Sequence, residues 1–185
     1  MSRRLILVAV LLFASIAHAR DRAVLVYPRE RSIFRRIFYT THQVALRTLL
    51  SARYDLDVHV QVATDDEIFA INVDGAKLLV LSGHGDTFAM HFSGKKSRTL
   101  DATDRDRLTS FLARLDPDAT IVLQSCNTGR GFAHLVKAAA GSRQVIAARG
   151  EVPWNGLQIT SIVPFDATIR CRDGSKRWDC TVRLP

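Results

Sequence analysis

The chain has 185 residues, with 26 Lys and Arg against 18 Asp and Glu, a formal net charge of +8 and only three cysteines. Residues 1–19 have the three parts of a cleavable export signal, which are a basic start, a central apolar stretch and a small-x-small cleavage site. These parts are Arg3 and Arg4, Leu5 to Ile16, and Ala17-His18-Ala19. The apolar stretch is short for a membrane span, so it predicts a secreted or periplasmic protein, with an uncleaved anchor as the less favoured alternative.

Removal of these 19 residues leaves 166, numbered 20–185, with a formal charge of +6. This length predicts a single domain with a substantial core, and no internal repeat or interdomain linker interrupts it. The positive charge suits a soluble exported protein, although it leaves attraction to an anionic envelope, an acidic partner or nucleic acid open. The first interpretation is favoured, and specific nucleic-acid recognition is not, because no long run of Lys and Arg or basic strip with interleaved aromatic residues occurs.

Apolar runs and helical stripes alternate along this segment. A first strand is predicted at Ala23–Tyr27, followed by a long helix that Ser32 caps, while the alternating pattern of Leu56–Val62 is typical of a half-exposed edge strand. Thr64-Asp65-Asp66-Glu67 resembles a capping box that opens a short helix. The other predicted elements are strands at 76–81, 120–124 and 144–148 and helices at 103–115 and 131–140. The alternation predicts an α/β fold, a three-layer αβα sandwich with a mainly parallel sheet.

The three cysteines divide into a pair and a single thiol. Cys171 and Cys180 flank the tight-turn signal Asp173-Gly174, which predicts a C-terminal hairpin between 168–170 and 181–183, within terminal strands at 160–185. Such a hairpin brings the two sulfurs together, and an oxidising compartment lets them form a disulfide. Cys126 is then left as a reactive residue, a partner in an intermolecular bond or an inert buried cysteine.

Two of the predicted strands end in chemically reactive residues. The run at 76–81 leads into Ser82-Gly83-His84-Gly85, and the run at 120–124 leads into Ser125-Cys126-Asn127-Thr128-Gly129. The carboxyl ends of parallel strands open into one crevice, so we expect His84 and Cys126 to meet there. A thiol beside an imidazole is a nucleophile with its base, and the amide of Gly85 is a candidate to hold an oxyanion.

This pairing resembles the caspase-like cysteine peptidases, a group that includes caspases, legumains, clostripains, gingipains, separases and CHAT-domain proteases. Gln124-Ser125-Cys126 is close to the caspase Gln-Ala-Cys, and Cys126-Asn127-Thr128-Gly129 is similar to the Cys-x-Thr-Gly of CHAT domains. The resemblance covers approximately residues 23 to 150 and implies a caspase-like fold and an endopeptidase without metal or cofactor. It further implies that Cys126 attacks a peptide carbonyl, that His84 polarises or protonates at the scissile amide, and that the amides of Gly85 and Cys126 hold the oxyanion.

Other functions remain as alternatives to a peptidase. A noncatalytic secreted binding protein on the same fold would engage an anionic or protein partner, and another thiol acyl-transfer reaction would use the same dyad. A metal site at His84 and His91 is disfavoured because no third ligand has suitable spacing, and the motifs of serine hydrolases and nucleotide-binding proteins are absent. Specificity for the residue before the scissile bond stays open, because it depends on the charge of the pocket that binds this residue. Asp86 or Glu151 in the pocket would favour a basic side chain, whereas Arg29, Arg130 or Arg149 would favour an acidic one.

Overall fold

The structure, a computed structural model, describes residues 20–30, 43–93, 99–153 and 155–185. The predicted export signal at 1–19 and the first part of the helix predicted from Ser32 lie outside these residues, and residues 43–51 are helical. The other described helices are α3 (Asp65–Phe69), α4 (Arg105–Ala113), α5 (Phe132–Ala140) and the short 3₁₀ helices η1 (Ala102–Asp104) and η2 (Thr128–Arg130). The strands are β1 (Asp21–Pro28), β2 (Tyr54–Val62), β3 (Leu78–Ser82), β4 (His84–Gly85), β5 (Met90–His91), β6 (Thr99–Leu100), β7 (Thr120–Gln124), β8 (Gln144–Ala148), β9 (Leu157–Ile162), β10 (Phe165–Asp173), β11 (Lys176–Asp179) and β12 (Thr181–Leu184).

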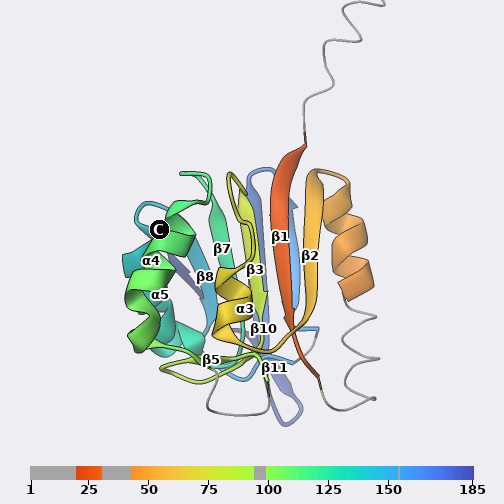
Figure 1. The fold of residues 1–185 in the computed structure, drawn as a ribbon. Coiled ribbons are helices and arrows are strands. Elements are labelled where there is room, and N and C mark those ends of the chain that lie inside the picture. The colour runs from red at the N-terminus through yellow and green to blue at the C-terminus, as the bar shows by residue number, and fades with distance from the viewer. Residues whose placement is uncertain (1–19, 31–42, 94–98, 154) are drawn as a thin grey trace, which may run out of the picture.

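Six strands form the central sheet in the order β12-β8-β7-β3-β1-β2 (Figure 1). The neighbours from β8 to β2 pair in parallel, and β12 pairs antiparallel with β8 at one edge. Every residue of β3 and β7 is buried, which is why these strands are continuous apolar runs in the sequence. The predicted α/β fold with a mainly parallel sheet is confirmed.

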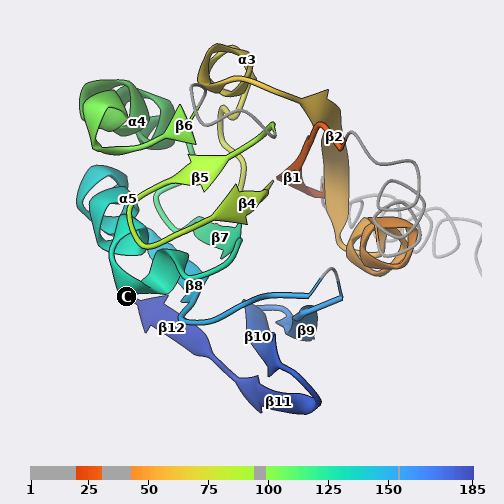
Figure 2. The ribbon, with the colours of Figure 1, turned by 90° about the horizontal axis from the view of Figure 1, so that it is seen from below.

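Different elements cover the two faces of this sheet. Helices α3, α4 and α5 pack on one face, and the helix at 43–51 with strands β9 and β10 covers the other, as the end-on view in Figure 2 shows. Leu46 and Leu50 of that helix join Leu157 of β9 and Ile169 of β10 in the second hydrophobic core. The prediction that helices alone cover both faces is therefore incomplete, because strands β9 and β10 form part of the second layer.

The predicted short helix α3 and edge strand β2 are confirmed, although the Glu67 carboxylate accepts from Ala63 N and so does not complete a capping box with Thr64. Thr64 Oγ1 accepts a hydrogen bond from Glu67 N at 3.1 Å, as a helix cap should, and β2 lies at the sheet edge. Val60 is nevertheless 53% exposed. An extra residue bulges β2 near Gln61, whose φ is 63°, so the alternation of inward and outward side chains breaks there.

The C-terminal segment contains the predicted disulfide in a different strand arrangement. Cys171 and Cys180 are bonded, with their Cα atoms 5.7 Å apart, and β10 and β11 form the hairpin around the Asp173-Gly174 turn. The sequence predicted that residues 181–183 pair with 168–170 in this hairpin, and this prediction was wrong. Thr181–Leu184 instead joins the main sheet as β12 and pairs with β8. The disulfide indicates an environment outside the reducing cytoplasm. Within the described ranges, no helix is long and apolar enough to cross a bilayer.

Candidate active site

The register of β3 and β7 brings the His84 and Cys126 segments to the same place on the sheet edge. The two strands pair from Leu78 and Thr120 to Ser82 and Gln124, where the buried Ser82 Oγ donates to Gln124 Oε1 at 2.8 Å. His84 and Cys126 each lie two residues beyond this last pair. Figure 2 looks onto this carboxyl edge, across which β4 and β5 lie.

Gly85 is in direct contact with the segment that carries the cysteine. A Cβ atom at Gly85 would lie 2.2 Å from Ser125 Oγ and 3.1 Å from the Cys126 carbonyl oxygen. No side chain fits into this space, so the residue after His84 must be glycine for the two segments to approach so closely. Gly85 is thus a direct neighbour of Ser125 and Cys126, and the approach of the His84 ring to the Cys126 sulfur stays a prediction.

The turn after Cys126 is fixed by backbone hydrogen bonds. Asn127 adopts a left-handed conformation with φ of 58°, which asparagine tolerates better than most residues, and its N–H donates to Gly150 O at 3.0 Å. The Cys126 N–H donates to no acceptor among the residues that the structure describes. In the β4–β5 hairpin, Asp86 N donates to Ala89 O at 3.1 Å, and the alternation of an antiparallel ladder turns the Gly85 amide away from β5. Both amides have the freedom that an oxyanion donor needs.

The sulfur of Cys126 is half-buried and held by the segment after β8. Its Sγ accepts a hydrogen bond from Val152 N at 3.2 Å. Burial raises the pKa of the Cys126 thiol; the Val152 N–H opposes this shift, and the negative charge of Glu151 adds to it. Cys126 is consequently a thiol at neutral pH and needs a base to become a nucleophile.

His84 contacts a carboxylate that no sequence pattern indicated. Its side chain is 45% exposed, and its Nε2 lies 3.2 Å from Oε1 of Glu30, whose side chain is only 7% exposed. In sequence, Glu30 stands between two arginines just after β1, a pattern typical of a solvated loop. No local signal in the sequence therefore identifies Glu30 as a buried residue.

His91 pairs across the β4–β5 hairpin with His84 and has an acidic partner of its own. Its Nε2 lies 3.2 Å from Asp86 Oδ2, and the other oxygen of Asp86 accepts from the N–H groups of Phe88 and Ala89. Asp86 is therefore occupied within its own hairpin. In the described part of the chain, no group of three or more His, Cys, Asp or Glu side chains is placed to hold a metal ion.

A pocket of about 300 Å³ adjoins Cys126. It is lined by Cys126, Glu151, Val152, Pro153, Arg172 and Gly174. Of the five charged residues considered for specificity, Glu151 alone is in this lining. The β10–β11 hairpin contributes Arg172, whose Nε donates to Gly174 O at 2.6 Å. The pocket thus carries one charge of each sign beside the thiol.

Replacing Glu151 with glutamine is expected to lower the pKa of Cys126. The neutral side chain removes a charge that disfavours the thiolate, so more thiolate forms at a fixed neutral pH. Alkylation by iodoacetamide should accelerate by about two- to threefold at neutral pH, because solvent screens an exposed carboxylate. The pH–rate profile measures this as a midpoint moved to lower pH. Asp118→Asn, which lies at the other end of the strands, is the control, and an unmoved or higher midpoint in Glu151→Gln would contradict the expectation.

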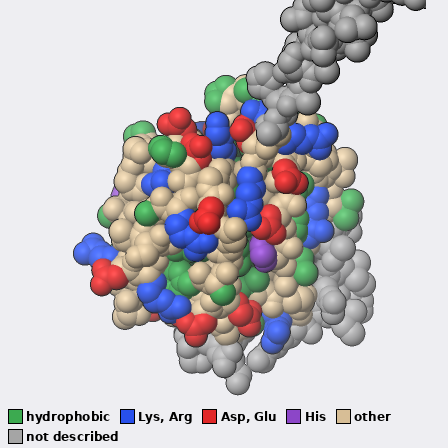
Figure 3. All heavy atoms as spheres, turned by 45° about the horizontal axis from the view of Figure 1, so that its top comes forward, with side chains coloured by type: hydrophobic (Ala, Val, Ile, Leu, Met, Phe, Trp, Pro, Cys, Tyr) green, Lys and Arg blue, Asp and Glu red, His purple; other side chains and the backbone are tan. Residues whose placement is uncertain are grey.

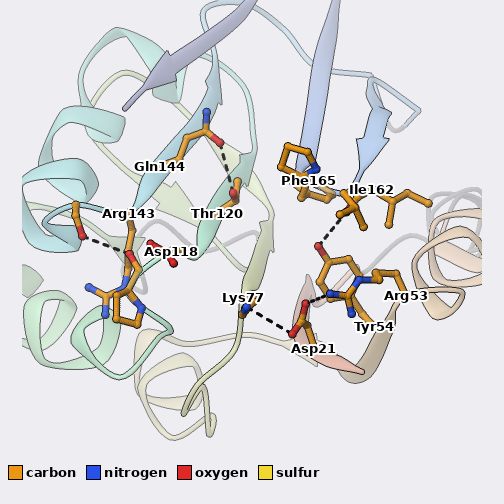
Figure 4. A pocket seen from close by; sticks show the side chains of 14 residues that line it. Asp21, Arg53, Tyr54, Lys77, Asp118, Thr120, Arg143, Gln144, Ile162 and Phe165 are labelled. Atoms are coloured by element: carbon orange, nitrogen blue, oxygen red, sulfur yellow. Dashed lines mark hydrogen bonds and ion pairs between the residues drawn. The ribbon is translucent and has the colours of Figure 1, made fainter. Parts of the chain in front are cut away.

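A larger cavity of about 480 Å³ lies at the opposite, amino edge of the sheet. Figure 4 shows Arg53 and Lys77 directed toward Asp21, and Tyr54 OH donates to Ile162 O at 3.4 Å across the cavity. On this side of the molecule basic and acidic side chains are interspersed (Figure 3). The cavity is therefore remote from the cysteine, and Asp21, Arg53 and Lys77 in its lining are paired with one another.

Comparison with models of known protein families and with curated protein sequences found no match to this chain.

Proposed function

We propose that the protein is an exported cysteine endopeptidase of caspase-like type, in which Cys126 is the nucleophile and His84 the base. The observation that carries the proposal is the close packing of Gly85, the residue after His84, on Ser125 and Cys126 at the carboxyl edge of two buried parallel strands. This is where α/β proteins bind ligands. The free Cys126 amide and the outward Gly85 amide supply donors for an oxyanion.

The protonated state of the Cys126 thiol determines the first step of the proposed reaction. Because Cys126 begins protonated, His84 accepts its proton as Sγ bonds to the peptide carbonyl carbon, and the carbonyl oxygen becomes an oxyanion. Collapse of this intermediate breaks the C–N bond, and the leaving amine takes the proton from His84. Water then gives a proton to His84 and attacks the thioester. The C–S bond then breaks and the carboxylic acid leaves. His84 returns its proton to Sγ, which restores the enzyme.

Covalent labelling tests the proposal. A peptidyl acyloxymethyl ketone library with varied terminal residues should label the mature protein once, at Cys126, because the other two cysteines are bonded to each other. Cleavage of a mixed peptide library should yield new carboxyl termini in mass spectra. Cys126→Ala should lose both labelling and cleavage, and cleavage that persists in this variant would overturn the proposal.

A noncatalytic binding protein is the second candidate, and the raised pKa of Cys126 favours it. In that case the thiol is a packing residue, and the positive surface engages an anionic or protein partner. It predicts an intact peptide library and an unlabelled Cys126, together with binding that weakens as salt increases. The same labelling experiment therefore separates the two candidates.

A further inference from the structure

Glu30 is held at its position by the strand ends around it. The N–H of the preceding Arg29 donates to both Val62 O at 2.8 Å and Phe92 O at 3.0 Å. These bonds tie the end of β1 to β2 and to the residue after β5. Since β5 pairs with β4, which carries His84, the backbone itself brings Glu30 toward the histidine.

The carboxylate of Glu30 needs a partner because it is buried. Its Oε1 is enclosed and accepts no hydrogen bond within the described ranges, while His84 Nε2 lies 3.2 Å away. An unpaired buried carboxylate is unfavourable, and a small rotation of the imidazole ring would direct an Nε2–H at this oxygen. His91 does not compete for Glu30, because its own Nε2 pairs with Asp86.

We infer that Glu30 is a positioning residue that fixes the orientation and tautomer of His84. With the Nε2–H donated to Glu30, the lone pair of the neutral ring is on Nδ1, and Nδ1 is the atom that takes the proton from Cys126. The resulting imidazolium has the carboxylate as its partner, and Nδ1–H then gives its proton to the leaving amine. This inference rests on the proposed peptidase for its catalytic consequence, although the tautomer itself does not depend on any activity.

Ring ¹⁵N chemical shifts of His84 test the inference directly. In the wild type, at a pH above the titration of histidine, the spectrum should show protonated Nε2 and unprotonated Nδ1. Glu30→Met fills a similar volume without an acceptor and should give a mixture of tautomers. Glu30→Gln keeps an acceptor oxygen and should retain the wild-type tautomer. Asp86→Asn is the matched control, because it alters the partner of His91 and should leave His84 unchanged.

The kinetic measurement is separate from the spectrum. Glu30→Met should lower kcat for peptide cleavage roughly 10- to 100-fold with KM nearly unchanged, and Glu30→Gln should recover part of this loss. Thermal unfolding shows whether each variant is folded. If Glu30→Met does not fold, Glu30→Gln still tests the inference. A wild-type spectrum with protonated Nδ1, or the same tautomer in folded Glu30→Met, would overturn the inference. The expected tautomers in a protein that cleaves no peptide would instead reject the proposed function alone.

Discussion

The His84→Ala variant is expected to cleave peptides at least about 100-fold more slowly than the wild type, with the loss in kcat. The reason is the state of the nucleophile. Burial keeps Cys126 protonated at neutral pH, so the thiol cannot attack without a group that accepts its proton. Initial rates on the peptide identified by library cleavage measure the effect, and alkylation of Cys126 by iodoacetamide should slow as well.

The exposed His134 on α5 provides the matched control, since His134→Ala removes an imidazole of the same kind away from the site. His84→Ala also leaves Glu30 buried without its partner, which we expect to lower the free energy of unfolding by about 1–3 kcal/mol. The double variant His84→Ala/Glu30→Met should recover this stability but not the activity. If His84→Ala cleaves peptides at the wild-type rate, His84 is not the base.

The sequence predicted those parts of the fold that depend on local patterns. Continuous apolar runs identified β3 and β7 because both faces of these strands are buried, and the Thr64 cap marked the start of α3. The predicted pairing of β12 in the C-terminal hairpin was wrong. Its short alternating pattern is compatible with pairing to β8 or to β10, and the structure pairs it with β8. The prediction of the second layer was incomplete because the positions of β9 and β10 depend on contacts with helical residues that are distant in the sequence.

The candidate site divides in the same way between local and distant determinants. His84 and Cys126 stand at abrupt changes from apolar to small residues, and parallel pairing makes such changes coincide in space. Glu30 and the Val152 amide have no such signal. Glu30 reaches His84 only because bonds from Arg29 tie three strand ends together, and Val152 reaches the sulfur because the C-terminal hairpin supports its segment.

Removal of the disulfide, in the variant Cys171→Ala/Cys180→Ala, is expected to lower the free energy of unfolding by about 2–4 kcal/mol. The bond closes a short loop, and both cysteines are buried in the second hydrophobic core, so the variant loses a constraint on the unfolded chain and packing in the folded one. Denaturant unfolding of residues 20–185 measures the change. Lys176→Ala, exposed on β11 and leaving the disulfide intact, should stay within about 0.5 kcal/mol of the wild type.

The same variant should change the chemistry of Cys126, because a chain of contacts joins the disulfide to the sulfur. A Cβ at Gly150 would lie 2.9 Å from Cys171 Sγ, Arg172 N donates to Glu151 O at 2.9 Å, and Val152 N donates to Cys126 Sγ at 3.2 Å. Loosening this segment exposes the thiol and removes the burial that raises its pKa. Iodoacetamide should then react faster while peptide cleavage slows, since the pocket wall is no longer fixed. Equal alkylation rates in a measurably destabilised variant would show that the hairpin stabilises the fold without shaping the site.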